Sequence, residues 1–222
     1  MSALVLLSAG SATATVNNPG AWAVFSGSGS FRPADKDNRW RYWIDAQHRY
    51  FDIGSGITQS VLRPAVGMRF DNGVTVLVGY GYFNNRRTDG ERFEEHRPWQ
   101  QVGWTALKRD RSSLGVRLRL EQRFLDIGDD VGWTLRTQLS YTRRLGNANR
   151  WQAIAFLEPF FDLNDTDWGG EARLSQNRVF LGAGYRMTNT LSLEFGYMHQ
   201  YFARPGENLG NHLGILHLKF RR

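Results

Sequence analysis

Apolar and polar residues alternate with a period of two over most of this chain. The clearest run lies between Leu114 and Glu121, where Leu, Val, Leu and Leu alternate with Gly, Arg, Arg and Glu. Successive side chains of a β-strand point to opposite faces, so this period predicts strands with one apolar and one polar face. No amphipathic helical pattern separates the segments, which predicts an all-β chain.

Ten segments carry this pattern and are predicted to be strands. They are 39–49, 57–70, 74–82, 96–107, 113–124, 132–143, 151–161, 176–187, 190–201 and 211–220, and many are ten to twelve residues long. Strands of soluble proteins most often have about 5–6 residues, whereas a tilted strand that crosses a membrane needs about 9–11. The lengths therefore predict a transmembrane, antiparallel, up-and-down β-barrel of ten strands within residues 39–222.

The connections between these segments alternate in length. Short turns are predicted at 71–73, 108–112, 145–149 and 188–189, and longer polar loops at 83–95, 125–131, 162–175 and 202–210. In outer-membrane barrels the short turns face the periplasm and the longer loops face the exterior. We therefore expect the last strand to run toward the periplasm and to end there at Phe220.

The first residues have the pattern of an export signal. Leu4–Leu7 form a short apolar core, and Ala12-Thr13-Ala14 supplies the small residues that a signal peptidase needs, so cleavage after Ala14 is expected and residues 1–14 are assigned to a signal peptide. No Lys or Arg precedes the apolar core, which leaves open a true start upstream of Met1.

Residues 15–38 form an N-terminal segment whose place stays open between the periplasm, the lumen and a first strand. Trp22, Val24 and Phe25 are typical of a strand, but counting 21–31 gives eleven strands. A bacterial single-chain barrel is expected to have an even number. Either ten strands span the membrane and 21–31 lies elsewhere, or twelve strands span it and one more is hidden in the sequence.

Composition excludes several classes of protein. The chain has 28 Lys and Arg against 21 Asp and Glu, a formal charge of +7, but the arginines are spread through strand-like segments and not gathered in a basic run, so no nucleic-acid partner is expected. The absence of cysteine excludes disulfides and thiolate metal sites. No apolar stretch reaches 18 residues, so residence in a membrane requires a barrel.

The charged face of segment 113–124 decides which side of a membrane barrel is outside. An arginine that faces lipid near the bilayer midplane costs about 2–4 kcal/mol, so Arg117 and Arg119 should face the lumen and Leu118 the lipid. A soluble barrel would show the same alternation with the faces reversed, but strand length, loop alternation and the signal-like start favour the membrane. Aromatic residues near predicted strand ends are expected in interfacial belts: Trp99, Trp104, Trp133, Trp151, Tyr141, Tyr185, Tyr197 and Phe220.

Several runs are similar to a known family. They are Arg39–Trp43, Glu95–Gln101, Arg119–Phe124, Phe160–Gly169 and Gln176–Gly182. Through them the chain resembles an uncharacterised family of Gram-negative outer-membrane β-barrels, domain of unknown function 2490, over most of its length from Trp22 to Phe220. The resemblance implies a barrel in the bacterial outer membrane and implies no activity.

Strand directions predict where the luminal charges meet. Glu121 and Glu158 fall near the upper ends of upward strands, and Arg97, Arg136 and Arg178 near the beginnings of downward strands, so we expect a layer of arginine–carboxylate pairs in the extracellular half of the lumen. The layer can be an internal plug or a constriction that holds a ligand or ion. The predicted luminal polar network comprises Glu95, Arg97, Gln101, Arg119, Glu121, Arg123, Arg136, Glu158, Arg178, Glu194 and Gln200.

Other polar motifs predict less. The histidines His96, His199, His212 and His217 have no serine and carboxylate beside them in a recognisable set, so no catalytic residues and no enzyme are expected. The loop with Asp162, Asn164, Asp165 and Asp167 fails the EF-hand pattern and is predicted to be a hydrogen-bonded turn, with no metal. The glycines Gly79, Gly81, Gly182 and Gly184 are expected to face a crowded lumen.

Three functions remain open on the sequence alone. The barrel can be structural or a narrow, porin-like pore, it can bind a small anion or a lipid headgroup through its luminal arginines, or it can be a surface-exposed lipid-modifying enzyme. No cofactor is expected. The surroundings expected for such a barrel are outer-membrane lipid and lipopolysaccharide, with recognition of the C-terminal strand by the barrel assembly machinery, while any small-molecule ligand stays unknown.

Overall fold

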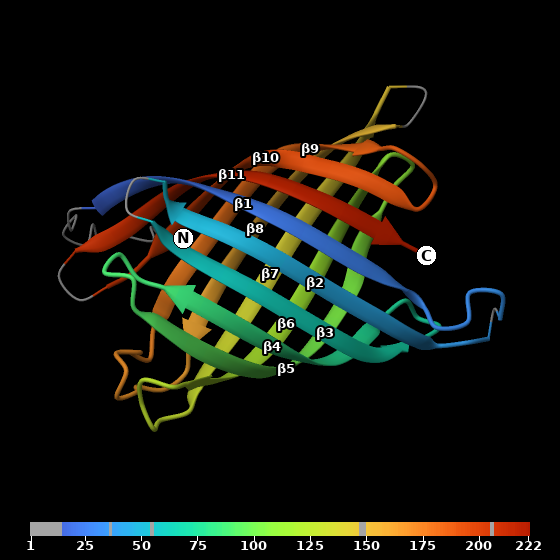
Figure 1. Cartoon of the computed structure of the whole chain (residues 1–222). Helices are drawn as coiled ribbons and strands as arrows, with labels where there is room; N and C mark the ends of the chain where they lie inside the picture. Colours follow the sequence, from blue (N-terminus) through green and yellow to red (C-terminus); the bar gives the residue numbers. More distant parts are fainter. Residues whose placement is uncertain (1–14, 36, 54–55, 147–149, 205–206) are drawn as a thin grey trace, which may run out of the picture.

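The alternating segments form long strands that close into one barrel (Figure 1). The computed structural model describes residues 15–222 except 36, 54–55, 147–149 and 205–206, so the predicted signal peptide, 1–14, lies outside the described residues. The strands are β1 (Thr15–Ser30), β2 (Trp40–Asp52), β3 (Ile57–Arg69), β4 (Thr75–Arg86), β5 (Arg92–Lys108), β6 (Ser112–Leu125), β7 (Gly132–Leu145), β8 (Trp151–Asp162), β9 (Leu174–Arg186), β10 (Leu191–Phe202) and β11 (Asn208–Arg221). None of the described residues lies in a helix long and apolar enough to cross a membrane.

The barrel is antiparallel everywhere except at its closure. Strands that follow each other in sequence pair antiparallel, whereas β1 pairs with β11 in parallel, from Thr15 opposite Asn208 to Ser28 opposite Arg221. When an up-and-down barrel has an odd number of strands, its first and last strands run in the same direction. The pair that closes such a barrel must therefore be parallel.

The predicted number of strands was wrong. All ten predicted segments are strands, but the described residues hold an eleventh, β1, which contains the segment 21–31. The expectation of an even number assumes antiparallel closure, and the continuous parallel ladder between β1 and β11 removes that requirement. The second half of β1 is also difficult to predict as a strand from sequence, because Ser26, Gly27, Ser28 and Gly29 stand where other strands alternate large apolar and charged residues.

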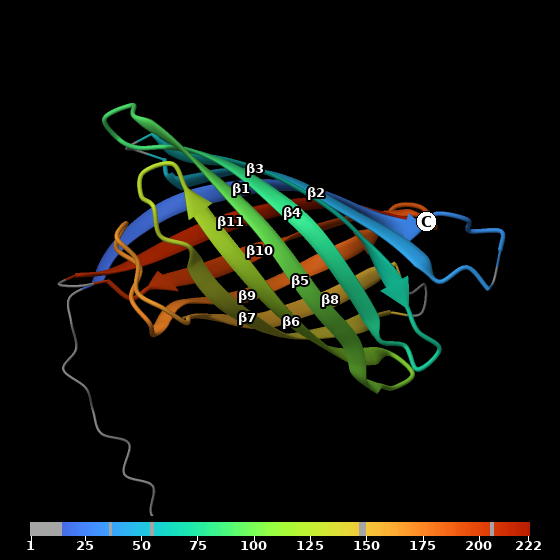
Figure 2. The same ribbon diagram turned by 90° about the horizontal axis from the view of Figure 1, so that it is seen from below.

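The two rims of the barrel carry different connections. One rim, here called the long-loop rim, carries the loops 87–91, 126–131 and 163–173, and the opposite rim, here called the C-terminal rim, carries 70–74, 109–111 and 187–190 (Figure 2). The predicted contrast between long loops and short turns is largely wrong. Much of the predicted loops 83–95 and 202–210 is strand, because β4 and β5 stay paired as far as Arg86 opposite Arg92 and β11 begins at Asn208.

Apolar side chains cover the outside of the barrel and charged side chains fill the inside. Leu118 is 39% exposed, whereas Arg119 and Glu121, on the opposite face of the same strand, are each 1% exposed. Other large apolar residues exposed on the outside include Ile44, Leu62, Val66, Val78, Val102, Leu139, Leu157, Val179, Leu181, Phe195 and Leu216. This is the polarity of a barrel whose outside meets hydrocarbon.

One of the predicted interfacial aromatics lies inside the barrel. Trp133, Trp151, Tyr141 and Tyr197 are exposed as expected, but Trp99 is 1% exposed and lies in the lumen. Trp99 has the same parity along β5 as the buried Glu95, so parity and not closeness to a strand end decides its side. The expected crowding at the luminal glycines is confirmed most clearly across from Trp99, where a Cβ on Gly79 would lie 2.3 Å from the indole ring.

Candidate functional site

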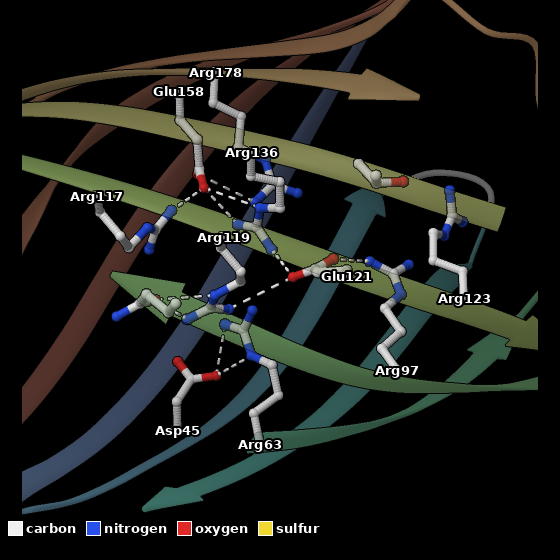
Figure 3. A network of polar contacts seen from close by, with 12 residues as sticks. Asp45, Arg63, Arg97, Arg117, Arg119, Glu121, Arg123, Arg136, Glu158 and Arg178 are labelled. Carbon is white, nitrogen blue, oxygen red and sulfur yellow. Dashed lines mark hydrogen bonds and ion pairs between the residues drawn. The ribbon is translucent and has the colours of Figure 1, made fainter. Parts of the chain in front are cut away.

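Three neighbouring strands supply the centre of a luminal network of ion pairs. Arg136 on β7 donates from Nη1 to Glu121 Oε1 on β6 at 2.6 Å, and from Nη2 to Glu158 Oε1 on β8, also at 2.6 Å (Figure 3). All three side chains are at most 4% exposed. One guanidinium therefore joins two buried carboxylates, which is the arrangement that lets buried carboxylates remain ionised.

The network continues toward the long-loop rim through Glu95. Arg97 donates to Glu95 Oε2 at 2.6 Å and to Glu121 Oε2 at 3.1 Å, and Arg123 donates from Nε to Glu95 Oε1 at 2.6 Å. Glu95 is 2% exposed. Each oxygen of this buried carboxylate thus faces a different arginine, so the sequence-predicted residues on β5 and β6 do form pairs.

Further arginines surround Glu158 and Glu121. Arg117 pairs with Glu158 Oε1, and Arg178 Nη1 lies 3.8 Å from Glu158 Oε2. Arg119 donates two hydrogen bonds to Gln101 Oε1, at 2.7 and 3.0 Å, and its Nη1 lies 3.6 Å from Glu121 Oε1.

A second buried pair was not predicted. Arg63 on β3 donates from Nε to Asp45 Oδ1 on β2 at 2.8 Å, and its Nη2 lies 2.7 Å from the same oxygen. Asp45, Arg49 and Arg63 are buried and face the network, yet the sequence analysis left them out. The alternation along β2 could have predicted that Asp45 and Arg49 face the lumen, since Asp45, Gln47 and Arg49 alternate with apolar or aromatic residues.

Positive charge exceeds negative charge in this layer. Eight arginines face four carboxylates: Arg49, Arg63, Arg97, Arg117, Arg119, Arg123, Arg136 and Arg178 against Asp45, Glu95, Glu121 and Glu158. Among the described residues no carboxylate lies within 4.0 Å of Arg49, which donates instead to Gln47 at 2.7 Å and Gln59 at 2.5 Å. Its guanidinium carbon lies 4.2 Å from the centroid of the Trp22 ring.

Aromatic rings support the arginines from their faces. The guanidinium carbons of Arg97, Arg119 and Arg136 lie 4.0, 4.0 and 4.3 Å from the ring centroids of Phe83, Trp99 and Phe160 respectively. A ring against the flat face of a guanidinium attracts the cation and leaves its N–H edge free to donate hydrogen bonds. The layer is therefore ordered by stacking as well as by ion pairs.

The layer divides the lumen into two cavities. One, of about 770 Å³, extends to the C-terminal rim, and the other, of about 720 Å³, extends to the long-loop rim. Their linings share only Arg49 and Arg178. Glu121 lines neither cavity and is 1% exposed. The charged layer thus lies across the lumen and separates the two cavities.

The cavity at the C-terminal rim is strongly cationic. Beyond the arginines of the layer, its lining includes Lys108, Arg109, Arg111, Arg144, Lys219 and Arg221. The carboxylates in its lining are Asp45, Glu158 and Glu194. An excess of positive charge in a concave, partly desolvated space focuses the electrostatic potential and raises the local concentration of anions.

Glu194 was predicted in the same network as Glu121, but the structure places it apart, near the C-terminal rim. Its Oε1 accepts from Lys219 Nζ at 2.8 Å and from Gln152 Nε2 at 3.3 Å, and its Oε2 lies 3.6 Å from His217 Nδ1. The reason is strand direction: Glu194 is the fourth residue of an upward strand, β10. The alternation along β10 predicts that Glu194 faces the lumen, but it does not predict how deep in the lumen Glu194 lies.

The remaining predicted residues lie together. Gln200 on β10 is fully buried, and its side-chain amide lies between Asn211 and Arg178, with Gln176 beside it. Gln101 holds Arg119. Glu121, Arg136, Glu158 and Arg178 each fall in the half of their strand nearer the long-loop rim, the rim that the sequence predicts to be extracellular.

Two loops are clamped together over the long-loop rim. Asp167 accepts from the backbone N–H groups of Asp129 at 2.8 Å and Asp130 at 3.3 Å, which lowers the pKa of its carboxyl. Trp168 Nε1 donates to the carbonyl of Asp130 at 3.1 Å, and its ring lies 4.8 Å from the Arg123 guanidinium carbon. The aspartate-rich loop is thus hydrogen-bonded, and no group of three potential metal ligands occurs among the described residues.

Four of the five histidines lie on the outside of the barrel. His96 bonds to Tyr80, and His212 Nδ1 bonds to Tyr197 at 2.6 Å. His48 bonds to Ser60 at 2.9 Å, with no carboxylate within 4.0 Å among the described residues. These pairs give the outer surface polar rings near the long-loop rim and no set of a nucleophile, a base and a carboxylate.

The fold and the layer define a class: a closed β-barrel with an apolar outside and a lumen filled by buried ion pairs. The particular family follows from the sequence. The pattern of the family described as "Protein of unknown function (DUF2490)" matches residues 19–211, and an uncharacterized protein of Methylorubrum extorquens is 33% identical over 166 residues, covering 72% of this chain and 70% of that protein. The chain belongs to this family, which confirms the resemblance.

The comparison with solved structures found an outer-membrane protein and a porin, both at low sequence identity. Outer-membrane expressed OmpT of Vibrio cholerae is 13% identical with a TM-score of 0.42, and the match covers 76% of this chain and 57% of that one, so this chain spans little more than half of its length. The NanC porin is 13% identical with a TM-score of 0.45, and the match covers 84% of this chain and 89% of that one.

Proposed function

We propose that this protein is an integral barrel of the bacterial outer membrane that binds a small organic anion in a lumen closed by its arginine layer. The observation that carries the proposal is the excess of arginines in the layer: eight guanidinium groups, five of them buried and three partly buried, share four carboxylates. Anion binding is one of the functions that the sequence leaves open, and the cationic cavity supports it over a plain plug or pore.

The apolar exterior supports residence in a membrane. The strands have 12 to 17 residues, long enough for a tilted strand to cross the hydrocarbon core. An outside face of Leu, Val and Phe would be costly in water and is stable in lipid. In this setting we place the C-terminal rim in the periplasm, with lipid and lipopolysaccharide around the barrel and the C-terminal strand available to the barrel assembly machinery.

The layer supports a closed lumen. Barrels of about eight strands are filled by side chains and those of 16–18 leave an aqueous channel. Eleven strands fall between these limits, and here long arginine and aromatic side chains occupy the centre. The two cavities on either side are then binding spaces and not parts of one continuous pore.

An anion would complete the charge balance of the larger cavity. Withdrawing a cation from water without a counter-charge is strongly unfavourable, so a layer that holds more buried and partly buried arginines than carboxylates gains stability when an anion binds. Arg117 Nε, Arg119 Nη1 and Trp22 Nε1 are buried donors without a hydrogen-bond partner in the structure, and their side chains line this cavity. A volume of about 770 Å³ is within the range of small-molecule sites.

Calorimetric titration of the purified protein in detergent tests this function. Citrate and glucose 6-phosphate should bind, with affinity that falls as salt rises, and glucose should not bind. Arg49→Gln should weaken binding, whereas Arg143→Gln, which removes the same charge from an exposed position on the outer face of β7, should leave it unchanged. Equal binding of glucose and glucose 6-phosphate, or an unchanged affinity in Arg49→Gln, would contradict the proposal.

A further inference from the structure

A serine, a histidine and a glutamate meet near the C-terminal rim, apart from the arginine layer. Ser26 Oγ lies 2.7 Å from His217 Nε2, and His217 Nδ1 lies 3.6 Å from Glu194 Oε2. The serine and the carboxylate therefore contact opposite nitrogens of one imidazole. This is the connectivity in which a histidine can take the proton of a serine hydroxyl while a carboxylate stabilises the imidazolium that forms.

The neighbours of His217 favour the tautomer that a general base needs. Glu194 is an acceptor, so it favours a proton on Nδ1 of His217. With that proton in place, Nε2 carries the lone pair and accepts from the Ser26 hydroxyl. The distance to Glu194 is longer than a full hydrogen bond, as is common in catalytic sets without substrate.

The three side chains are fixed by adjacent strands and by neighbours of their own. Glu194 on β10 stands directly opposite His217 on β11, and Ser26 lies on β1, the strand that pairs with β11 at the closure. Lys219 and Gln152 hold the other oxygen of Glu194, at 2.8 and 3.3 Å. Sites built on paired strands hold their geometry more closely than sites built on loops.

A small substrate can reach this set from the C-terminal rim. Ser26, His217 and Glu194 all line the cationic cavity of about 770 Å³. The ladder between β1, β2 and β11 engages the backbone around Ser26, so side chains must stabilise a developing oxyanion. Lys219, whose backbone stands opposite that of Ser26, is the cation placed closest in register.

We propose that Ser26, His217 and Glu194 form a hydrolytic site for small esters that carry a negative charge. Ser26 Oγ would attack the ester carbonyl while its proton passes to His217 Nε2. The alcohol then leaves with that proton, and an acyl group remains on Ser26. A water molecule, deprotonated by His217, attacks this acyl group, releases the acid and restores the serine. Glu194 acts as a positioning residue for His217.

The preference for anionic esters rests on the anion site of the proposed function. The assignment of Ser26 as a nucleophile does not depend on that site. The two parts therefore need separate measurements. The competing structural explanation is that the serine merely supplies a hydrogen bond to a luminal histidine, in which case Ser26 would have no greater reactivity than other serines of the cavity.

The first measurement tests the nucleophile. The full-length protein, purified in detergent, is treated with a biotinylated fluorophosphonate and the modified residue is identified by mass spectrometry. Ser26 should be labelled in the native protein and not after heat denaturation. Ser26→Ala should abolish labelling, and Ser28→Ala, two residues along the same strand and facing the same cavity, should retain it. Absence of labelling in the native protein, or labelling at another residue, overturns the hydrolytic site.

The second measurement tests turnover and selectivity. The protein should hydrolyse p-nitrophenyl hemisuccinate faster than neutral p-nitrophenyl acetate. His217→Gln should lower kcat by about 10²–10⁴-fold, the usual effect of losing a general base. Glu194→Gln should lower kcat while KM stays constant, and Glu194→Asp should recover part of it. Equal rates on the two esters with Ser26 still labelled would refute only the anion preference, and kcat unchanged in His217→Gln would refute the mechanism.

Discussion

Glu158 shows at the scale of one residue how the luminal charges depend on each other. It is 3% exposed, and it accepts hydrogen bonds from Arg136 at 2.6 and 3.1 Å and a further bond from Arg117. Arg178 lies 3.8 Å from its other oxygen. Removing this carboxylate would leave several buried guanidinium groups with less counter-charge in a site that already has too little.

Glu158→Ala should therefore destabilise the barrel by about 3–5 kcal/mol, the usual cost of breaking a buried ion pair on one side. The free energy of unfolding, from reversible urea unfolding in lipid vesicles, measures the effect. The matched control is Glu171→Ala on the exposed loop 163–173, where a partly exposed ion pair with Arg173 contributes about 0–1 kcal/mol. A change in Glu158→Ala as small as that of the control would contradict the account.

For single residues, the sequence predicted well which side of the barrel a side chain faces, but it predicted poorly which side chains contact each other. The alternation of β6 placed Arg119 and Glu121 inside, because each step along a strand reverses the face. It could not place Ser26 beside His217, because these residues are separated by most of the chain and meet only across the closure of the barrel. Trp99 was assigned to the outside because strand ends were weighed above parity.

At the scale of the strand, β6 shows most clearly which face of the barrel is apolar and which is charged. Leu118 lies near the middle of the strand and is 39% exposed, between the inward-facing Arg117 and Arg119. An arginine at this position would face the centre of the hydrocarbon core. The same substitution on a soluble barrel would enter an ordinary solvated face, so the result separates the two classes of barrel.

Leu118→Arg should cost about 2–4 kcal/mol or block assembly in the membrane. The measurement is the fraction of protein that stays folded on unheated gels after expression, followed by urea unfolding of the assembled material. Leu118→Ala retains the apolar character and is the control. A Leu118→Arg protein that folded normally and purified without detergent would show that the faces are reversed.

The strand β1 marks the limit of prediction at this scale. Only its middle, Ala21–Phe25, has the apolar pattern of a strand, because polar and small residues precede it at 17–20 and follow it at 26–29. More importantly, its partner is β11, and parallel pairing between the two ends of a chain leaves no local turn signal. The sequence predicted the nine antiparallel hairpins between β2 and β11, but it did not predict the pairing of β1 with β2 or with β11.

For the whole molecule, the account rests on a lumen that is closed and positively charged. The resemblance to an uncharacterised family and the period of two were enough for the barrel, its polarity and much of the arginine layer. The division into two cavities was not predictable, because it depends on how far eight arginine side chains reach across an eleven-stranded lumen.

Electrical recording from a planar bilayer tests this claim most directly. The wild-type protein, inserted from detergent, should show no long-lived conductance steps, because the arginine layer, with Arg136, Glu121 and Glu158 at its centre, lies between the two cavities. Replacing these three residues together with alanine should open the lumen and produce steps that favour anions over cations, since the other arginines remain. Stable, open-channel steps from the wild-type protein, equal to those of the triple variant, would contradict the account.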